Sequence, residues 1–213
     1  MAERETPLPG TRQERRKAAT RAKILDAAER LFGERGYAET SIEDISDAAD
    51  VAVRTIYTHF PSKAAIMLAA FDSWVDTFVG AVLQRPVDEP VADTVREALR
   101  AVEAAGFADH PEDHETPVHP MVGHLHEGSP DVAGHVLQRW MREMGRIAGD
   151  AIERGDYEPG SLEPQARAVA VFAAWIAALS AAGGREHGRD LPAGATGHGI
   201  GLEVLALMAS GKL

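Results

Sequence analysis

A short stretch near the N-terminus, residues 41–63, carries side chains whose types and spacing suit nucleic-acid binding. Its apolar residues recur at i, i+3 and i+7 in two successive groups separated by a short irregular step. This spacing predicts two short amphipathic helices joined by a tight turn. The second helix is too small to have a core of its own, and it turns outward the kinds of group that contact phosphates and base edges in a DNA major groove. These outward residues are Arg54, Thr55, Tyr57, Thr58 and His59.

The sequence around this stretch predicts a helical N-terminal region. Gly36 is placed to end the first helix. Thr40 and Ser41 are good N-caps for the second helix. Pro61 ends the third helix, because proline disfavours helical backbone at the preceding residue and has no amide donor. We expect helices over 18–35, 42–49 and 53–59, followed by one long helix over 63–83.

Length and composition narrow the class of protein. The chain has 213 residues, enough for a small domain attached to a larger one. It contains no cysteine, which excludes disulfides, thiolate metal ligands and a cysteine nucleophile. No run approaches the roughly 18 apolar residues of a membrane span. The simple expectation is a cytoplasmic protein with no membrane segment.

The net charge of −11 opposes binding to phosphates unless the basic residues are clustered. Residues 1–63 contain 11 Lys+Arg and 11 Asp+Glu, whereas residues 64–213 contain 11 and 22. The excess of acid therefore lies beyond Lys63. Residues 1–17 hold prolines, a glycine and many charges, so we expect a flexible basic arm there, which serves either nucleic-acid binding or only solubility.

The rest of the chain predicts more helices. We expect one over 91–108, one from Ser129 to about Arg154, one from after Ser161 to about Ala182, and one over 200–208. A Gly-rich loop over 183–199 precedes the last helix. The helix that ends at Ala182 is rich in alanine, which permits close helix approach. Together with the final helix it suits a four-helix interface between two copies of the chain.

Aromatic and methionine side chains recur at helical spacing in this C-terminal part. Such residues are either core or the lining of a site for a hydrophobic, partly aromatic small molecule. The candidate ligand-binding residues are Trp74, Phe78, Phe107, His124, Trp140, Met144, Phe172 and Trp175.

Residues 109–128 are a competing signal, with five histidines among prolines and acidic residues. Imidazoles and carboxylates are ligands of zinc and nickel. However, the prolines interrupt any long helix that would align the histidines, and no His-Glu-x-x-His pattern occurs. We interpret the stretch as an acidic loop and assign no metal ligand. A metal-responsive regulator or a metal-dependent hydrolase is the alternative.

Taken in order, the segments LFGERGYAETSIEDIS and DVAVRTIYTHFPSKAAIMLAAF resemble the TetR family of bacterial transcriptional regulators over about residues 20–72. The resemblance implies an all-α protein. A helix-turn-helix DNA-binding domain over 18–62 would be joined by a long helix to a helical regulatory domain over 63–213, which binds a ligand and dimerises.

The resemblance also implies roles for single residues. Thr40 and Ser41 would lie by the DNA backbone at the start of the second helix. Arg54 and Thr55 would reach base edges, and Tyr57, His59 and Lys63 would hold phosphates.

The chain departs from the family pattern at three positions. Val53, where the family often has a polar residue, either touches a thymine methyl or belongs to the core. Asp50 stands where a glycine is common, and Ala52 stands where a hydroxyl cap is common. Since aspartate tolerates left-handed backbone less well than glycine and alanine is a poor cap, we expect a softer recognition helix.

The function that follows is a homodimeric regulator of transcription that pairs through its last two helices. We expect a repressor released from operator DNA by a small hydrophobic or aromatic effector, with no enzymatic activity and no cofactor. A helical adaptor that has lost DNA binding is a third interpretation, motivated by Asp50, Ala52 and the acidic balance.

Overall fold

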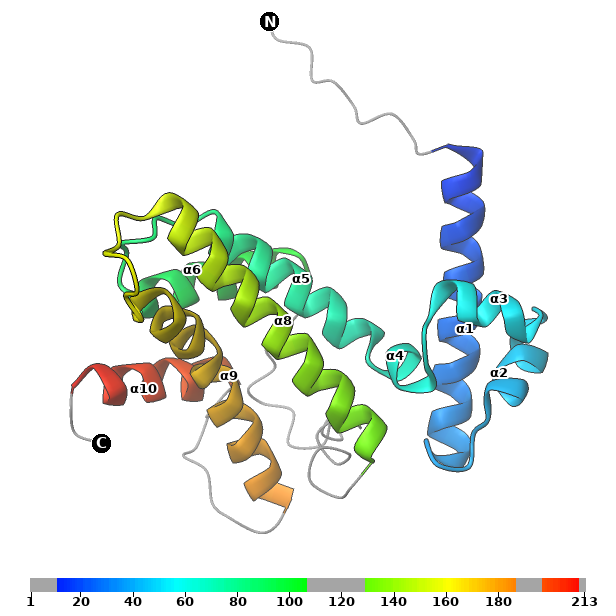
Figure 1. Cartoon of the computed structure of the whole chain (residues 1–213). Coiled ribbons are helices and arrows are strands. Elements are labelled where there is room, and N and C mark those ends of the chain that lie inside the picture. Colours follow the sequence, from blue (N-terminus) through cyan, green and yellow to red (C-terminus); the bar gives the residue numbers. More distant parts are fainter. Residues whose placement is uncertain (1–10, 107–128, 187–196, 211–213) are drawn as a thin grey trace, which may run out of the picture. The chain divides into compact units, whose positions relative to one another are not determined.

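The computed structural model describes residues 11–106, 129–186 and 197–210, and the chain divides into two compact units between Ala69 and Ala70. Every regular element in these ranges is a helix, as Figure 1 shows, which confirms the all-α prediction. No helix in the same ranges is long and apolar enough to cross a membrane.

The N-terminal unit is a small bundle built on one buried cluster. Ile24, Ile45 and Ile56 come from three different helices, are fully buried and belong to that cluster. Burying a side chain of this size stabilises a fold by roughly 1.5–3 kcal/mol. The helices of the unit are α1 (Arg12–Arg35), α2 (Ile42–Ala49), α3 (Val53–His59) and α4 (Lys63–Met67).

The first helix begins earlier than the predicted Ala18. Thr11 caps α1 by accepting a hydrogen bond from the Glu14 amide at 3.2 Å, and the Glu14 carboxylate accepts one from the Thr11 amide at 2.6 Å. This reciprocal capping box fixes the first turn. Residues 12–17 are therefore helical, and the expectation of a flexible arm is wrong for them.

The long helix predicted over 63–83 is interrupted. Its first part, α4, ends at Met67, and α5 (Ala69–Leu83) follows after Leu68, which has φ −91° and ψ 11°. Leu68 is fully buried. Neither proline nor glycine occurs in residues 63–79, so the local sequence carries no sign of the break. The break at Leu68 lies next to the boundary between the two units, which falls after Ala69.

In the C-terminal unit, α9 packs mainly against α10, α8 and α6. The predicted helix after Ser129 is confirmed, with Pro130 in its first turn. The helix predicted to end at Ala182 continues, however, and the final helix begins before the predicted start at 200, so the predicted Gly-rich loop is partly helical. The elements of the unit are α5, α6 (Val91–Ala104), α8 (Pro130–Arg154), α9 (Glu163–Glu186) and α10 (Gly197–Ala209).

Candidate functional site

The turn between α2 and α3 has the construction that the sequence predicts. Ser41 caps α2 by accepting from the Asp44 amide at 3.0 Å, and the Asp44 carboxylate accepts from the Ser41 amide at 2.9 Å. At the other end Asp50 adopts left-handed backbone, with φ 52° and ψ 52°. The Ser46 hydroxyl donates to the Val51 carbonyl at 2.6 Å, and the Val51 amide donates to the Ser46 carbonyl at 3.1 Å. The cap at Ser41 thus fixes the start of α2, and the two Ser46–Val51 hydrogen bonds fix the turn that follows it.

The third helix has an anchored face and an open face. Ile56 and Phe60 are buried in the core of the unit. Arg54, Tyr57 and Thr58 lie at i, i+3 and i+4 and are exposed, with 54% of Tyr57 accessible to solvent. A guanidinium, a phenol and a hydroxyl therefore share one surface of α3, which is the combination that positions a helix on phosphates and reads base edges.

The N-terminal end of α3 differs from a well-capped helix. Ala52 is its N-cap residue and makes no side-chain cap hydrogen bond. Val53 and Thr55 are half-buried, between the core and the open face. Both readings of Val53, core residue and contact with a thymine methyl, are compatible with this position.

Thr40 lies inside the N-terminal unit. Its side chain is 1% exposed, and its hydroxyl lies 2.9 Å from the Gly36 carbonyl and 3.3 Å from the Leu31 carbonyl, both acceptors in or after the last turn of α1. The hydroxyl therefore closes the end of α1 rather than facing outward. The implied contact of this side chain with a DNA phosphate does not fit its burial.

Lys63 lies in a defined internal position. Its ammonium donates to the Tyr37 carbonyl at 2.9 Å and to the Thr40 carbonyl at 3.0 Å, and lies 4.2 Å from the centre of the Tyr37 ring. Two of its three N–H groups are thus used within the unit, which leaves one for a phosphate.

His59 is half-buried at the end of α3. Its Nδ1 atom is enclosed and has no hydrogen-bond partner within residues 11–106, 129–186 and 197–210. Burial lowers the pKa of His59 below its ordinary value, and the positive charges of Lys17 and Arg21 act in the same direction. Arg21 itself lies over the ring of the next residue, Phe60, at 4.8 Å from the ring centre.

In the C-terminal unit, three tryptophans from three helices lie in one aromatic cluster. Trp74 of α5 stacks on Phe78 at 4.9 Å between ring centres and lies 4.3 Å from Trp175 of α9. Trp140 of α8 meets Trp175 edge-on at 6.1 Å. Phe71 also contacts Trp175, at 5.4 Å. Four of the predicted ligand-binding residues are therefore together, and Phe71, one helical turn before Trp74, joins them although the prediction omitted it.

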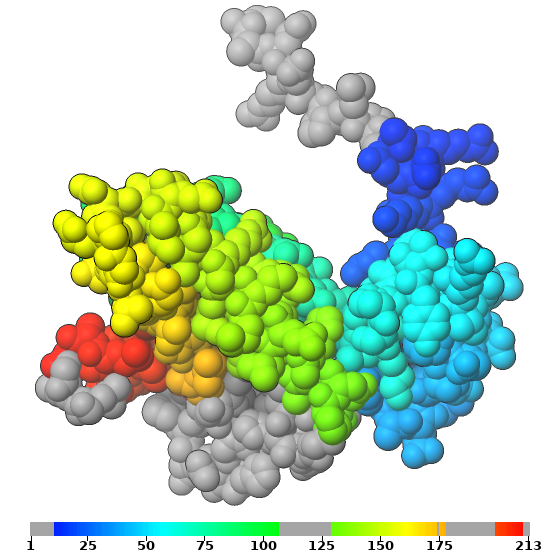
Figure 2. Space-filling view, in the orientation of Figure 1, coloured from blue at the N-terminus to red at the C-terminus, as the bar shows by residue number. Residues whose placement is uncertain are grey.

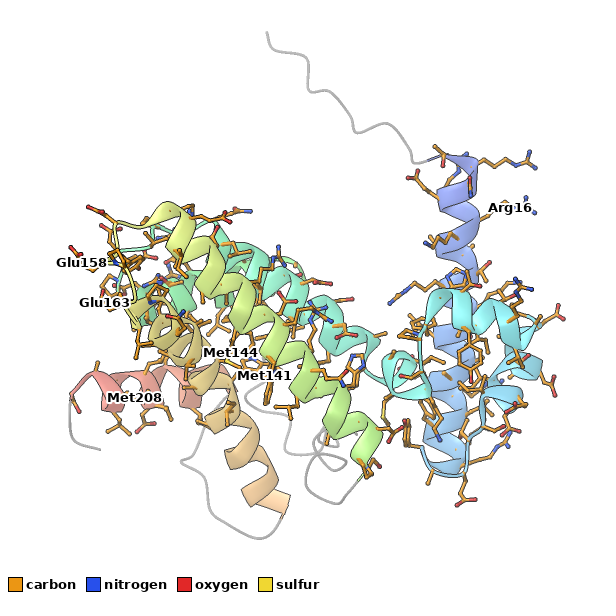
Figure 3. The ribbon with its side chains drawn as sticks, in the orientation of Figure 1. Arg16, Met141, Met144, Glu158, Glu163 and Met208 are labelled. Atoms are coloured by element: carbon orange, nitrogen blue, oxygen red, sulfur yellow. The ribbon has the colours of Figure 1, made fainter. Side chains whose placement is uncertain are left out.

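The indole N–H of Trp140 is buried and has no hydrogen-bond partner among the residues that the structure describes. An unpaired buried donor costs free energy unless a partner is supplied. Met144 lies one turn further along α8 and is half-buried, on the same side of the helix as Met141 (Figure 3). The cluster therefore combines flat apolar surfaces with one donor for an acceptor group.

Charged groups lie next to Trp140 along α8. Glu143 is 3% exposed and has three arginines within 3.5 Å, namely Arg139, Arg142 and Arg146. His135 contacts Asp72 of α5 at 3.0 Å. The His135–Asp72 pair ties α8 to α5, and the three arginines neutralise the buried carboxylate of Glu143.

Three candidate ligand-binding residues lie outside this aromatic cluster or outside the described residues. Phe172 is fully buried, as expected of a core residue. Phe107 and His124 lie outside the described residues, as does the His-rich stretch 109–128. Within the part of the chain that the structure describes, no group of three or more histidine, aspartate or glutamate side chains could hold a metal ion.

Comparison with known proteins connects the helix-turn-helix to one family. Residues 24–70 match the family described as bacterial regulatory proteins, tetR family. The transcriptional regulator TcmR of Streptomyces glaucescens is 32% identical over 146 residues, 68% of this chain and 64% of TcmR. The transcriptional regulator TtgR of Pseudomonas putida is 47% identical over 58 residues, 27% of this chain and 28% of TtgR. The matched segments thus span less than two thirds of either relative.

Solved structures extend the likeness to the whole fold. FadR of Thermus thermophilus, a TetR-family repressor solved with lauroyl-CoA, aligns with a TM-score of 0.53 over 91% of this chain and 95% of that one, at 21% identity. FadR of Bacillus halodurans aligns with a TM-score of 0.50 over 90% and 95%, at 16% identity. At such identities the likeness establishes the fold alone.

Proposed function

Because the chain belongs to the TetR family of bacterial regulatory proteins, we propose that it is a DNA-binding transcriptional regulator whose third helix reads a major groove. The observation that carries this proposal is the division of α3 into two faces. Ile56 and Phe60 fix the helix to the core, while Arg54, Tyr57 and Thr58 face solvent together.

The side chains of α3 that lie outside the core have distinct tasks in this proposal. Arg54 donates to base edges, for which guanine offers two acceptors that a guanidinium can bridge. Tyr57, Thr58 and His59 hold phosphates on either side, which fixes the register of the helix without reading sequence. Ser41, at the exposed N-terminus of α2, lies by the DNA sugar-phosphate backbone.

The active species is a homodimer formed through α9 and α10. Val169 and Ile176 on α9 and Leu207 and Met208 on α10 are large apolar side chains of which 41–54% is exposed. A second copy of the same faces would cover them in a four-helix interface. Dimerisation also suits the reading mechanism, since one short helix contacts too few bases for useful specificity.

The proposed role is repression that a small hydrophobic or aromatic effector relieves. The cluster of Trp74, Trp140 and Trp175 is the proposed effector site, and the Trp140 N–H, which has no partner in the described part of the chain, is its hydrogen-bond donor. An effector releases DNA only if it binds the DNA-incompetent conformation more tightly than the competent one.

Selection of bound fragments from genomic DNA tests the DNA-binding proposal. The expected fragments share a pseudo-palindrome whose half-sites are centred about one helical turn, or a multiple of it, apart. Arg54→Ala is expected to lose this selection, whereas Arg96→Ala, an exposed arginine of α6, keeps it. Recovery of fragments without a shared sequence by the wild-type protein would reject the proposal.

Intrinsic fluorescence tests the effector site, because the chain has three tryptophans and all three belong to the cluster. An aromatic probe, 8-anilinonaphthalene-1-sulfonate, is expected to quench this fluorescence and to weaken DNA binding in the same concentration range. Quenching without any change in DNA affinity would show that the cluster binds the probe but does not control DNA binding.

A further inference from the structure

The first turns of α1 carry an ordered row of basic side chains that the proposed role of α3 does not use. Arg12, Arg16 and Thr20 follow one another at i, i+4 and i+8, with Gln13 and Lys17 alongside. The capping box at Thr11 makes this segment helical, so the row has a fixed direction. Figure 2 shows these turns of α1 standing clear of the rest of the N-terminal unit, and Figure 3 shows Arg16 projecting from the helix into solvent.

This row faces the end of α3 across an open concavity of about 780 Å³. Thr58 and His59 of α3 form the other wall. Arg21 holds the two helices together there, because its guanidinium lies over the Phe60 ring. The lining consists of Arg12, Gln13, Arg16, Lys17, Thr20, Thr58 and His59.

Among the described residues, no ion pair compensates the positive charge of the concavity. None of the ion pairs among the described residues involves Arg12, Arg16 or Lys17. Glu14 is the one acid in residues 11–25, and it belongs to the capping box rather than to the lining. A groove lined by several cations and no carboxylate attracts anions.

His59 adds a second observation at the same place. Its Nδ1 atom is enclosed without a partner among the described residues, and burial, followed by the charges of Lys17 and Arg21, lowers the pKa of the imidazole and so disfavours its charged form. A phosphate in the groove would offset that repulsion. An imidazole placed among lysine and arginine side chains is therefore better accommodated with an anion present than without one.

We propose that the groove between the first turns of α1 and the end of α3 is a binding site for the DNA sugar-phosphate backbone next to the major groove that α3 reads. This proposal rests on the proposed function and extends its contact surface to α1. Arg12 and Arg16 are the phosphate-binding side chains, and they supply affinity and register rather than sequence preference.

The salt dependence of binding distinguishes this role. Each phosphate neutralised by a basic side chain contributes a slope of about −0.9 to log K against log salt on duplex DNA. The double variant Arg12→Gln/Arg16→Gln should therefore reduce the magnitude of the slope by roughly 2 for one bound head and roughly 4 for a bound pair. Affinity should fall by similar factors on operator and random duplex, so that their ratio is unchanged.

The matched control is Arg96→Gln/Arg100→Gln on α6, which changes the net charge equally and removes only exposed pairs with Asp93 and Glu97. Fluorescence anisotropy at several salt concentrations measures both variants, and circular dichroism verifies their helix content. A slope equal to that of the control, while wild type still prefers its operator, overturns this site and leaves the proposed function intact. A loss of operator preference in the α1 variant overturns it too, since it would assign the arginines to base reading. If wild type shows no preference for any duplex, the proposed function fails first.

Discussion

The ammonium of Lys63 lies 4.2 Å from the centre of the Tyr37 ring and donates a hydrogen bond to the Tyr37 carbonyl at 2.9 Å. Its second bond, to the Thr40 carbonyl, reaches the residue before the N-cap of α2. One side chain at the start of α4 thus fixes the connection between α1 and α2. The position of α2 therefore depends on this lysine, and so does the position of the turn that leads into α3.

Replacing Lys63 by methionine should therefore lower the free energy of unfolding. The change removes two charge-assisted hydrogen bonds and a cation–π contact but keeps the apolar stem, and we expect a loss of about 1–3 kcal/mol. Urea denaturation followed by circular dichroism measures it. Lys23→Met, at an exposed position of α1, is the control and should change stability by less than about 0.5 kcal/mol. Equal values for the two variants would remove Lys63 from this role.

The bounds of α2 and α3 were predictable because their signals are local. Each signal acts within a few residues. Ser41 supplies a hydroxyl cap, Asp50 tolerates left-handed backbone, and Pro61 ends the helix before it. The early start of α1 also has a local signal, the Thr11–Glu14 capping box, but the prolines and charges before it favoured disorder.

The side-chain role of Lys63 could not be predicted, because its partner, the Tyr37 carbonyl, lies 26 residues earlier. Thr40 has one near partner, the Gly36 carbonyl 4 residues earlier, but its second, the Leu31 carbonyl, lies 9 residues earlier. The aromatic cluster has the same property. Helical spacing places Phe71, Trp74 and Phe78 on one side of α5, but only packing of α9 against α5 brings in Trp175.

Asp50 provides a test of the turn between α2 and α3. Left-handed backbone is free of steric cost for glycine and costs roughly 1–2 kcal/mol for a side chain without local hydrogen bonding. Asp50→Gly should match or exceed wild-type stability, and Asp50→Ala should fall below Asp50→Gly by about 1 kcal/mol. Chemical denaturation of the three proteins decides this. An alanine variant as stable as the glycine variant would show that the left-handed conformation is not maintained in solution.

Ala52 is the weak point at the start of α3. Its backbone is already extended, with φ −70° and ψ 146°, as an N-cap requires, but it offers no acceptor. Ala52→Ser should therefore stabilise the protein by about 0.5–2 kcal/mol. Ala48→Ser, at an exposed position inside α2, supplies no cap and serves as the control. The expected signature is a higher urea midpoint for the first variant alone, and no rise would mean that α3 does not need a cap.

Glu89 gives the C-terminal unit a predicted pH dependence. The Arg85 guanidinium, with Thr94 and Arg167 acting in the same direction, lowers the pKa of Glu89 from 4.5 to about 2. Since the folded-state pKa lies below the unfolded one, the stabilisation is fully present above pH 4.5 and is lost as the pH falls towards 2. Glu89→Gln should be less stable than wild type at pH 7 and approach it near pH 2. Thermal unfolding across this range, with exposed Glu153→Gln as reference, measures the difference, and a constant difference at all pH values would contradict the assignment.

The most direct test of the central claim is the affinity of the wild-type protein and of Arg54→Ala for a selected operator duplex and for a scrambled duplex of equal length, measured by fluorescence anisotropy at fixed salt. We predict that wild type prefers the operator and that Arg54→Ala loses about 1–3 kcal/mol, roughly tenfold to hundredfold, on the operator while its affinity for the scrambled duplex changes far less. Equal binding of wild type to both duplexes, or an equal loss on both in the variant, would contradict sequence reading by α3.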